Sequence, residues 1–348
     1  MTIHVQMGAA LHPKMGVGAD LLHGLRPSRV APVPSPSFRF ATGAARVGII
    51  SNPRSRRNWT VDLELKIGPG VLAAAPTTNA QLVETLQSFA KHRLELLVID
   101  GGDGTVRDVL SAAAAIYGDN LPPLALLPSG KTNALALDLG IPLGWSLEDA
   151  VTAHSTGRVQ TRAPIDVRRD DGDGPLRGFI FGAGGFVLAT ELAQGTHRFG
   201  AIDGLAVGLS LVGAIAQTCF GGSANRWRAG ERVEIFNHAT GETSVRELYL
   251  LLGSTLQRLP LGIKPLGTTS SGLDVLAVDS PPRMLPVAAA AVVMGKEGSW
   301  LERMGYHHGH DIPPVRLTLK RGFILDGELF PGGTIDVRTG APIRFVTP

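Results

Sequence analysis

The sequence predicts an α/β fold followed by an all-β fold: a doubly wound parallel-sheet domain and then an antiparallel β-sandwich domain. Three observations predict this order. Short apolar runs alternate with helical patterns in the first half of the chain, which is typical of βαβ units. Glycine-containing turns follow two of these runs. Beyond Pro164 the apolar segments become short and are separated by turn residues, as in β-sandwiches.

The length of the chain favours two domains. Its 348 residues are too many for one ordinary core and enough for two. We expect a flexible N-terminal arm over residues 1–44, which contain one acidic residue, several basic ones and a Pro/Ser-rich run at 32–36. The α/β domain is then expected over residues 45–160. The β-sandwich domain takes residues 161–348, and its C-terminal part returns to the cleft between the domains.

Apolar periodicity and turn residues place the elements of the α/β domain. Residues 47–50 and 94–99 are continuous apolar runs, which is typical of buried strands. Residues 79–91 carry large apolar side chains at helical spacing, and residues 77–79 supply capping side chains. The expected elements are strands over 47–50, 94–99 and 124–127 and helices over 79–91, 106–116 and 133–139.

The second half of the chain has a different pattern. Its short apolar segments predict antiparallel strands joined by turns. Two longer apolar stretches, 202–220 and 284–300, predict helices within this domain. The expected strands cover 165–168, 179–181, 232–236, 247–252, 275–278, 315–319 and 334–337.

Composition excludes several classes of protein. The formal net charge is +3 and no run of Lys and Arg reaches five residues, so nucleic-acid binding is not expected. The single cysteine, Cys219, can form neither an internal disulfide nor a cysteine-based zinc site. The longest apolar stretch, 205–220, is interrupted by polar residues and glycines, so no membrane span is expected. The N-terminus lacks the apolar core of a secretory signal, and we expect a cytoplasmic protein.

The first loop that carries chemistry is Gly101-Gly102-Asp103-Gly104-Thr105, which follows an apolar strand and opens a helix. Glycines let the backbone come close to a ligand, and the amides at a helix N-terminus favour phosphate. Asp103 would repel phosphate unless a cation such as Mg²⁺ lies between them. The alternative is an ordinary strand–turn–helix in which Asp103 caps the helix.

A second loop, Pro128-Ser129-Gly130-Lys131-Thr132-Asn133, also follows a strand and opens a helix. In a doubly wound sheet two such loops lie side by side at the carboxyl edge, where ligands bind. The pair therefore predicts a nucleotide site. The second loop is not a Walker A motif, because Ala125 stands where that motif needs glycine.

These loops resemble the diacylglycerol kinase catalytic domain family, whose signature is similar to residues 101–109, Gly-Gly-Asp-Gly-Thr-Val-Arg-Asp-Val. Further similarities follow in the family's order over residues 45–348. They are Asn52-Pro53-x-Ser55, Pro128-x-Gly130-x-x-Asn133, Ile165-Asp166-Val167 followed by Gly182–Phe186, Gly272-Leu273-Asp274-Val275 and Asp326-Gly327-Glu328.

The resemblance implies a Mg²⁺- and ATP-dependent lipid kinase with its active site in the cleft between two domains. Diacylglycerol is the first-choice acceptor and phosphatidate the product, as in phospholipid biosynthesis; a sphingoid base or ceramide is the alternative. The resemblance implies that Asp103 and Asp166 organise the metal, and that Glu328 is the general base with Asp326 beside it. The residues it assigns to the nucleotide are Asn52, Ser55, Gly101, Gly102, Gly104, Thr105, Ser129, Gly130, Lys131 and Asn133.

Other interpretations stay open. Taken alone, residues 326–328 are also typical of a plain β-turn. The chain departs from the family where Lys131 and Ala134 replace a threonine and an aspartate, and where Thr269–Gly272 replaces an acidic pair that in some relatives helps to hold a structural magnesium. These departures favour a degenerate nucleotide- or lipid-binding regulator. The Asp-Gly-Glu segment after a long β domain argues against a NAD kinase.

Two further expectations concern the histidine-rich segment and contact with a membrane. The histidine-rich segment 307–311 lacks the i, i+4 spacing of a zinc site and is predicted to be a solvated loop. A lipid substrate implies peripheral contact with the inner face of a membrane, through exposed apolar or basic surface. The sequence predicts no oligomeric state.

Overall fold

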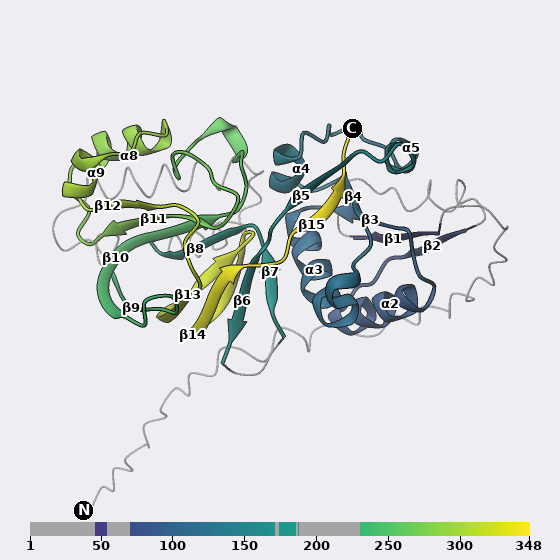
Figure 1. The fold of residues 1–348 in the computed structure, drawn as a ribbon, viewed down its shortest axis with the longest axis horizontal. Coiled ribbons are helices and arrows are strands. Elements are labelled where there is room, and N and C mark those ends of the chain that lie inside the picture. Colours follow the sequence, from purple (N-terminus) through teal and green to yellow (C-terminus); the bar gives the residue numbers. More distant parts are fainter. Residues whose placement is uncertain (1–45, 54–69, 171–173, 186, 188–229) are drawn as a thin grey trace, which may run out of the picture. The chain divides into compact units, whose positions relative to one another are not determined.

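The computed structural model describes residues 46–53, 70–170, 174–185, 187 and 230–348. The predicted arm, the predicted helix over 202–220, Cys219 and Ser55 lie outside these residues. Among the described helices, none is long and apolar enough to cross a membrane. Figure 1 shows the two sheets that organise the described chain.

The first sheet confirms the predicted α/β architecture. Its order is β2-β1-β3-β4-β15-β5, and all neighbours are parallel except β15 and β5. The central strand β3 is buried along its whole length, as expected when helices cover both faces of a parallel sheet. The strands are β1 (Val47–Ser51), β2 (Val71–Ala74), β3 (Leu96–Gly101), β4 (Leu124–Pro128), β5 (Val159–Arg162) and β15 (Ile343–Val346).

Helices pack on both faces of this sheet (Figure 1). On one face, α2 (Asn79–Lys91), α3 (Asp103–Tyr117) and α4 (Ala134–Asp138) share one apolar cluster with the strands. On the other face, α5 (Leu147–Ser155) packs against β3, β4 and β15, and its Ala150 and Ala153 are buried there. The sheet is therefore doubly wound. A short 3-10 helix, η2 (Gly118–Asn120), follows α3.

The second sheet is antiparallel and has nine strands in the order β12-β11-β10-β8-β13-β14-β6-β7. The remaining strand, β9, pairs with both β10 and β13, so β8, β10, β9 and β13 form a closed ring of pairs around an apolar core. The strands are β6 (Ile165–Arg169), β7 (Leu176–Gly178), β8 (Ile180–Gly184), β9 (Glu231–Asn237), β10 (Thr243–Ser254), β11 (Asp274–Asp279), β12 (Tyr306–Gly309), β13 (Val315–Leu325) and β14 (Glu328–Thr339).

Two helices cover part of this sheet. The sequence predicts one helix over 284–300, but the structure has α8 (Leu285–Val293) and α9 (Ser299–Arg303). Gly295 and Gly298 between them take φ of 78° and 128°, which a continuous helix does not allow. Both helices bury apolar side chains in one cluster with β11 and β12. A 3-10 turn, η5 (Pro260–Gly262), precedes them in the chain.

The C-terminal strand differs from the sequence-based expectation. The sequence assigns residues 161–348 to the β domain, with a return to the cleft. The structure instead places β15 inside the first sheet, between β4 and β5. Phe345 is fully buried there, opposite Leu124 of β4. The chain therefore crosses from the β domain back into the α/β core, which couples the stabilities of the two domains.

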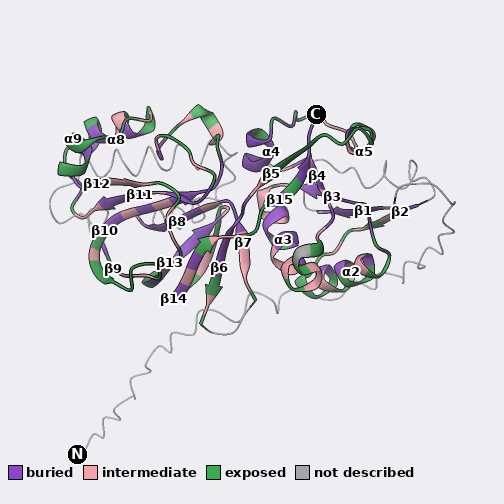
Figure 2. Ribbon diagram, viewed as in Figure 1, coloured by how far each residue is buried: buried purple, intermediate pink, exposed green. Residues whose placement is uncertain are grey.

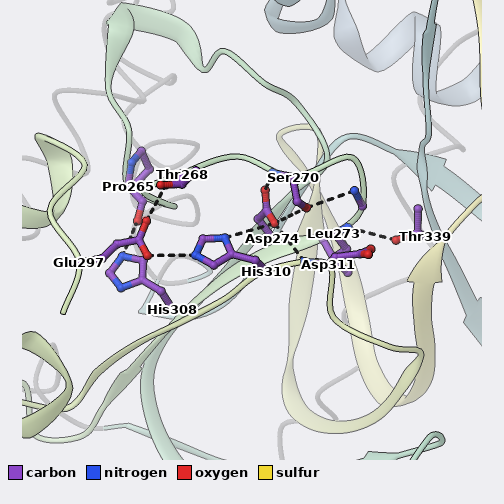
Figure 3. Close-up of polar contacts among 11 residues, drawn as sticks. Pro265, Thr268, Ser270, Leu273, Asp274, Glu297, His308, His310, Asp311 and Thr339 are labelled. Atoms are coloured by element: carbon purple, nitrogen blue, oxygen red, sulfur yellow. Dashed lines mark hydrogen bonds and ion pairs between the residues drawn. The ribbon is translucent and has the colours of Figure 1, made fainter. Parts of the chain in front are cut away.

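The predicted solvated loop at 307–311 is wrong for His307 and His308, which lie on β12 and pair with β11. The segment belongs to a polar network around the buried Asp274 (Figure 3). Asp274 accepts hydrogen bonds from the Ser270 hydroxyl at 2.6 Å and from the backbone N–H of Asp311 at 3.1 Å. His310 lies between Asp274, at 3.4 Å from its Nδ1, and Glu297, at 3.0 Å from its Nε2.

We expect this network to make the stability of the protein fall as the pH rises above about 6.5, the ordinary pKa of histidine. The hydrogen bond and charge of Glu297 raise the pKa of His310, so the folded state binds the proton more tightly than the unfolded state. The stabilisation is complete below the ordinary pKa and is lost as the pH passes the raised one. Burial lowers the pKa of His308, which weakens the folded state only at the acidic side of this window.

Urea unfolding of the wild type and of His310→Gln between about pH 6 and 8 measures this effect. The wild type should lose more free energy of unfolding across the window than the variant, by about 1 kcal/mol or less, as for an exposed ion pair. His154→Gln, on α5, is the control for a histidine outside the network. Equal pH dependence in the wild type and His310→Gln would contradict the role of His310.

Candidate active site

The first glycine-rich loop joins β3 to α3. Gly101 ends the strand, Gly102 is the N-cap and the helix begins at Asp103. The loop is compact because a Cβ on Gly101 would lie 2.5 Å from the Cβ of Thr105. Asn52, which follows β1, donates a hydrogen bond from its side chain to the Thr105 hydroxyl at 2.8 Å. Two segments distant in the sequence thus meet at the carboxyl ends of the neighbouring parallel strands β1 and β3.

The second loop packs directly against the first. A Cβ on Gly102 would lie 2.9 Å from the Cα of Gly130, so neither position has room for a side chain. Asn133 closes the second loop on itself: its side chain accepts from the Gly130 N–H at 2.9 Å and donates to the Gly130 carbonyl at 3.0 Å. Asn133 takes a left-handed φ of 51°, which asparagine tolerates better than most residues. It therefore shapes the loop from a buried position.

The two loops border a cavity of about 340 Å³. Most of the nucleotide residues assigned from the sequence line it, and so does Glu328 from the β domain. The sequence did not single out two further lining residues, Arg107 and Asp108. The lining residues are Asn52, Gly102, Gly104, Thr105, Arg107, Asp108, Ser129, Gly130, Lys131 and Glu328.

Arg107 connects α3 to the β domain. Its side chain is 8% exposed and lies 5.5 Å from the centre of the Phe330 ring. The guanidinium donates to the carbonyl of Leu325 at 3.3 Å and to Asp108 at 2.7 Å, and it lies 3.9 Å from the Glu328 carboxylate. The sequence offered one signal for this role. Gly104, Arg107 and Asp108 lie one turn apart, at i, i+3 and i+4, and so share one face of the helix.

Glu328 enters the cavity from a tight hairpin. Leu325 of β13 pairs with Glu328 of β14, so only Asp326 and Gly327 form the turn. Both take positive φ, 47° and 82°, as a type I′ hairpin requires, and Asp-Gly is a preferred sequence for it. The plain β-turn was one interpretation of this segment. The structure shows that turn, and it also shows that the turn delivers the Glu328 side chain to the cavity.

Asp326 and Asp103 line a second, much smaller cavity of about 10 Å³. The Asp326 carboxylate accepts hydrogen bonds from the backbone N–H groups of Phe179 and Ile180, both at 2.9 Å. Burial, together with the charge of Asp103, raises the pKa of Asp326 to about 7. Asp103 accepts from the backbone N–H of Leu135 at 3.3 Å, and burial raises its pKa too. Neither side chain is among those lining the larger cavity.

Three further assigned residues lie away from the larger cavity. Asp166, on β6, is buried and pairs with Arg177 at 3.0 Å and with Arg338 at 3.7 Å. Gly101 and Asn133 support the loops from behind the lining residues. Spacing along the chain could not reveal this, because it does not tell which way a side chain points.

Comparison with known proteins assigns the loops to a family. Residues 47–167 match the family described as the diacylglycerol kinase catalytic domain. The family resemblance predicted from the glycine-rich loops is confirmed, and the matched residues contain both loops that border the cavity.

Individual relatives are bacterial. The chain is 35% identical over 118 residues to "Diacylglycerol kinase" of Bacillus subtilis (strain 168), and 36% identical over 63 residues to "Lipid kinase YegS" of Escherichia coli (strain K12). These matches cover 34% and 18% of this chain, and 35% and 20% of the relatives. The chain thus matches about a third or less of the length of these two curated relatives.

Solved structures are similar in fold to a larger part of this chain. A solved structure described as a putative diacylglycerol kinase from Bacillus anthracis str. Sterne superimposes with a TM-score of 0.60 and 15% identity. The superposition covers 88% of this chain and 99% of the Bacillus anthracis chain. A second solved structure from the same organism gives a TM-score of 0.61 at 16% identity. These similarities confirm the predicted architecture, an α/β domain followed by an antiparallel β domain.

The contact between the two loops makes a specific prediction for Gly130→Ala. The new Cβ would collide with the Gly102 backbone, which has no side chain that can move aside. We expect the free energy of unfolding to fall by about 1–3 kcal/mol, the usual cost of overpacking. The measurement is urea unfolding followed by circular dichroism.

Gly144→Ala is the matched control, because a Cβ on Gly144 has no neighbour within 4 Å. The control should unfold close to the wild type. Equal stability of Gly130→Ala and Gly144→Ala would contradict the close packing of the two loops.

Proposed function

We propose that the protein is a Mg²⁺- and ATP-dependent lipid kinase that transfers the γ-phosphate of ATP to a lipid hydroxyl, with diacylglycerol as the first-choice acceptor and phosphatidate as the product. One observation carries the proposal: a single cavity joins both glycine-rich loops of the family domain to the carboxylate of Glu328. Phosphoryl transfer needs a phosphate cradle, neutralisation of charge and one group that orients the attacking hydroxyl.

The loops supply the cradle. Gly102, Gly104 and Gly130 leave room for phosphate oxygens to approach the backbone, and the N-terminus of α3 favours negative charge. Lys131 lines the same cavity and brings a positive charge to the second loop. This feature departs from the family, where threonine is usual. The volume of about 340 Å³ lies within the range of small-molecule sites.

Glu328 is the residue that we assign as the general base. Its carboxylate is exposed to the cavity, so it can accept a proton from a hydroxyl that enters from solvent or from a lipid. The hydroxyl oxygen forms a bond to the γ-phosphorus while the bond to the bridging oxygen of the β-phosphate breaks. The proton passes to Glu328, and ADP and the phosphorylated lipid leave.

The carboxylates that line the cavity are candidate ligands for a metal ion. Bound Mg²⁺ would neutralise the phosphates, and it prefers carboxylate and phosphate oxygens. The carboxylates that line the cavity are those of Asp108 and Glu328. Asp103 and Asp166, which the family resemblance assigns to the metal, are not among the residues that line this cavity. We therefore assign Asp108, on the face of α3 that borders the cavity, as a candidate oxygen donor beside them.

The competing function is a regulator that binds nucleotide or lipid without turnover. The replacements at Lys131 and Ala134 in the second loop favour it. Glu328 and the glycine cradle argue against it, because a binding protein needs no carboxylate beside the phosphate site. Sphingoid-base and ceramide kinases use the same transfer chemistry, so only the acceptor distinguishes them.

The test is transfer of phosphate from γ-labelled ATP to a panel of diacylglycerol, sphingoid base and ceramide in mixed micelles. We expect labelled phosphatidate with diacylglycerol. Binding of ATP without labelling of any lipid, by a folded protein, would favour the regulator. Labelling of another lipid alone would replace diacylglycerol as the acceptor.

Glu328→Gln should lower kcat at least about 100-fold, the scale of a lost general base. The side chain is exposed and close in shape to the original, so the melting temperature should stay near that of the wild type. Glu242→Gln, on an exposed turn of the β domain, is a matched control with normal kcat. A kcat within a few-fold of the wild type in Glu328→Gln would remove the residue from the mechanism.

Asp103→Ala should also lower kcat by at least about 100-fold, but with a different signature. Because Asp103 holds the start of α4 through Leu135, its loss should lower the melting temperature as well as activity. Differential scanning fluorimetry beside the kinase assay separates the two effects. Lost activity at an unchanged melting temperature would point to a direct role at the metal, and unchanged activity would exclude that role.

A further inference from the structure

The outer face of α8 is apolar although it faces solvent. Residues 284–294 read Met-Leu-Pro-Val-Ala-Ala-Ala-Ala-Val-Val-Met and contain no polar side chain. Leu285, Ala288 and Val292 form the buried stripe at i, i+3 and i+7. On the other side Val287 and Met294 are 55% and 66% exposed. A helix at the surface of a globular protein normally carries polar residues there, so this helix lacks its usual polar face.

Exposed apolar side chains are concentrated around this helix. The described residues include ten exposed large hydrophobic side chains, and six of them lie on α8, on its flanks, on α9 or in the 260–264 turn. That turn lies against the end of α8 because Lys264 donates its backbone N–H to the Val293 carbonyl at 2.9 Å. The six residues are Leu261, Met284, Val287, Val293, Met294 and Trp300, and we call them the α8 face. Figure 2 shows exposed segments along α8 and α9.

The charged residues next to α8 and in the adjoining turn are positive. Residues 255–273 and 280–296 contain no acidic residue. Arg283 and Lys296 flank α8 at its two ends, Lys264 lies in the adjoining turn, and all three are exposed. Beyond Lys296, Glu297 is engaged by His310 and by the backbone N–H of Thr268 (Figure 3). On α9, Glu302 and Arg303 offset one another. Positive charge is thus in excess around α8 and the adjoining turn.

We propose that the α8 face docks on a lipid bilayer that carries anionic headgroups. Apolar side chains in an interfacial helix enter the headgroup and acyl boundary, and nearby lysines and arginines bind anionic lipids. Methionines adapt to an irregular surface, and tryptophan is enriched at membrane interfaces. The inference rests on the proposed function in one respect: a kinase acting on diacylglycerol must reach a membrane. It names the surface that makes the contact.

Charge decides between a bilayer and a second copy of this chain as the occupant of this face. Two copies meeting through the α8 face would bring Lys264, Arg283 and Lys296 of one against the same residues of the other. No acidic residue in 255–273 or 280–296 is available to offset that repulsion. An anionic bilayer offers both the apolar interior and the opposite charge. The bilayer is therefore the occupant that the observations favour.

The test is cosedimentation of the full-length protein with sucrose-loaded vesicles, without ATP. Vesicles of phosphatidylglycerol with phosphatidylethanolamine are compared with vesicles of phosphatidylcholine alone. We expect binding to the anionic vesicles that is weaker on phosphatidylcholine and at high salt. The double variant Val287→Ser/Met294→Ser should bind at least about tenfold more weakly, because it removes two apolar side chains that would enter the bilayer. Lys264→Gln/Lys296→Gln should lose about fivefold per charge, and only on anionic vesicles.

Val245→Ser is the matched control. Val245 is 48% exposed on β10, where it pairs with β9, so the same kind of change is made away from the α8 face. Vesicle binding by the α8 variants equal to that of the wild type and Val245→Ser, with melting temperatures unchanged, would overturn the proposal. So would a dimer, seen by sedimentation velocity, that Val287→Ser/Met294→Ser dissociates while vesicle binding is unaffected.

A soluble, short-chain diacylglycerol separates this inference from the proposed function. Because that acceptor needs no bilayer, Val287→Ser/Met294→Ser should phosphorylate it at the wild-type rate. The same variant should be slower only when the acceptor is presented in anionic vesicles. A wild-type protein that binds vesicles through the α8 face but phosphorylates neither form of the acceptor would contradict the proposed function and support the docking surface.

Discussion

The carboxylate of Asp326 holds the turn on which the candidate active site depends. It accepts backbone hydrogen bonds from Phe179 and Ile180, nearly 150 residues earlier in the chain. These bonds fix the β13–β14 hairpin at the start of β8, and Glu328 is the second residue after Asp326. A buried N–H group without a partner costs about 1–3 kcal/mol, so the turn has little freedom to move. The position of Glu328 therefore follows from the packing of the β domain.

Arg107 fixes the same hairpin from the other side. It lies on α3, and its guanidinium donates hydrogen bonds to the Leu325 carbonyl and to Asp108. The same guanidinium lies 3.9 Å from the Glu328 carboxylate. The planar guanidinium can satisfy several partners at once from a buried position, whereas a lysine offers a single compact charge. Arg107 thus links α3 to the β13–β14 hairpin. Lys131 is exposed, which leaves it free to follow a bound anion.

The sequence predicted what depends on local pattern. Continuous apolar runs located β1, β3 and β4, and the loops after β3 and β4 located the edge of the sheet that borders the larger cavity, because parallel strands must place those loops together. The same pattern could not locate β15, since a short strand with apolar alternation fits either sheet. Nor could it show that Asp103 caps α4 while Asp108 faces the cavity, because the choice between them depends on how α4 packs beside α3.

The network around Asp274 shows how one departure from the family is accommodated. Where the family resemblance implies acidic residues before Gly272, this chain has Ser270, whose hydroxyl and backbone N–H both donate hydrogen bonds to the Asp274 carboxylate. A hydroxyl donor satisfies a buried carboxylate directly, whereas a second carboxylate would need a cation between the two. His310 extends the network to Glu297, which holds the backbone of Thr268.

The network around Asp274 also supports the α8 face, through the loop that packs against α8. The loop that begins at Lys264 runs through Thr268 and Ser270 to Asp274, so the network fixes it at one end while the Lys264–Val293 hydrogen bond fixes it to α8 at the other. Glu297 lies just after the C-terminal end of the same helix. Polar bonds on the inner side of this loop therefore hold in place a helix whose outer side is apolar. An exposed apolar surface of this kind keeps a defined shape only where the structure beneath it is rigid, and here hydrogen bonds to a buried carboxylate provide that rigidity.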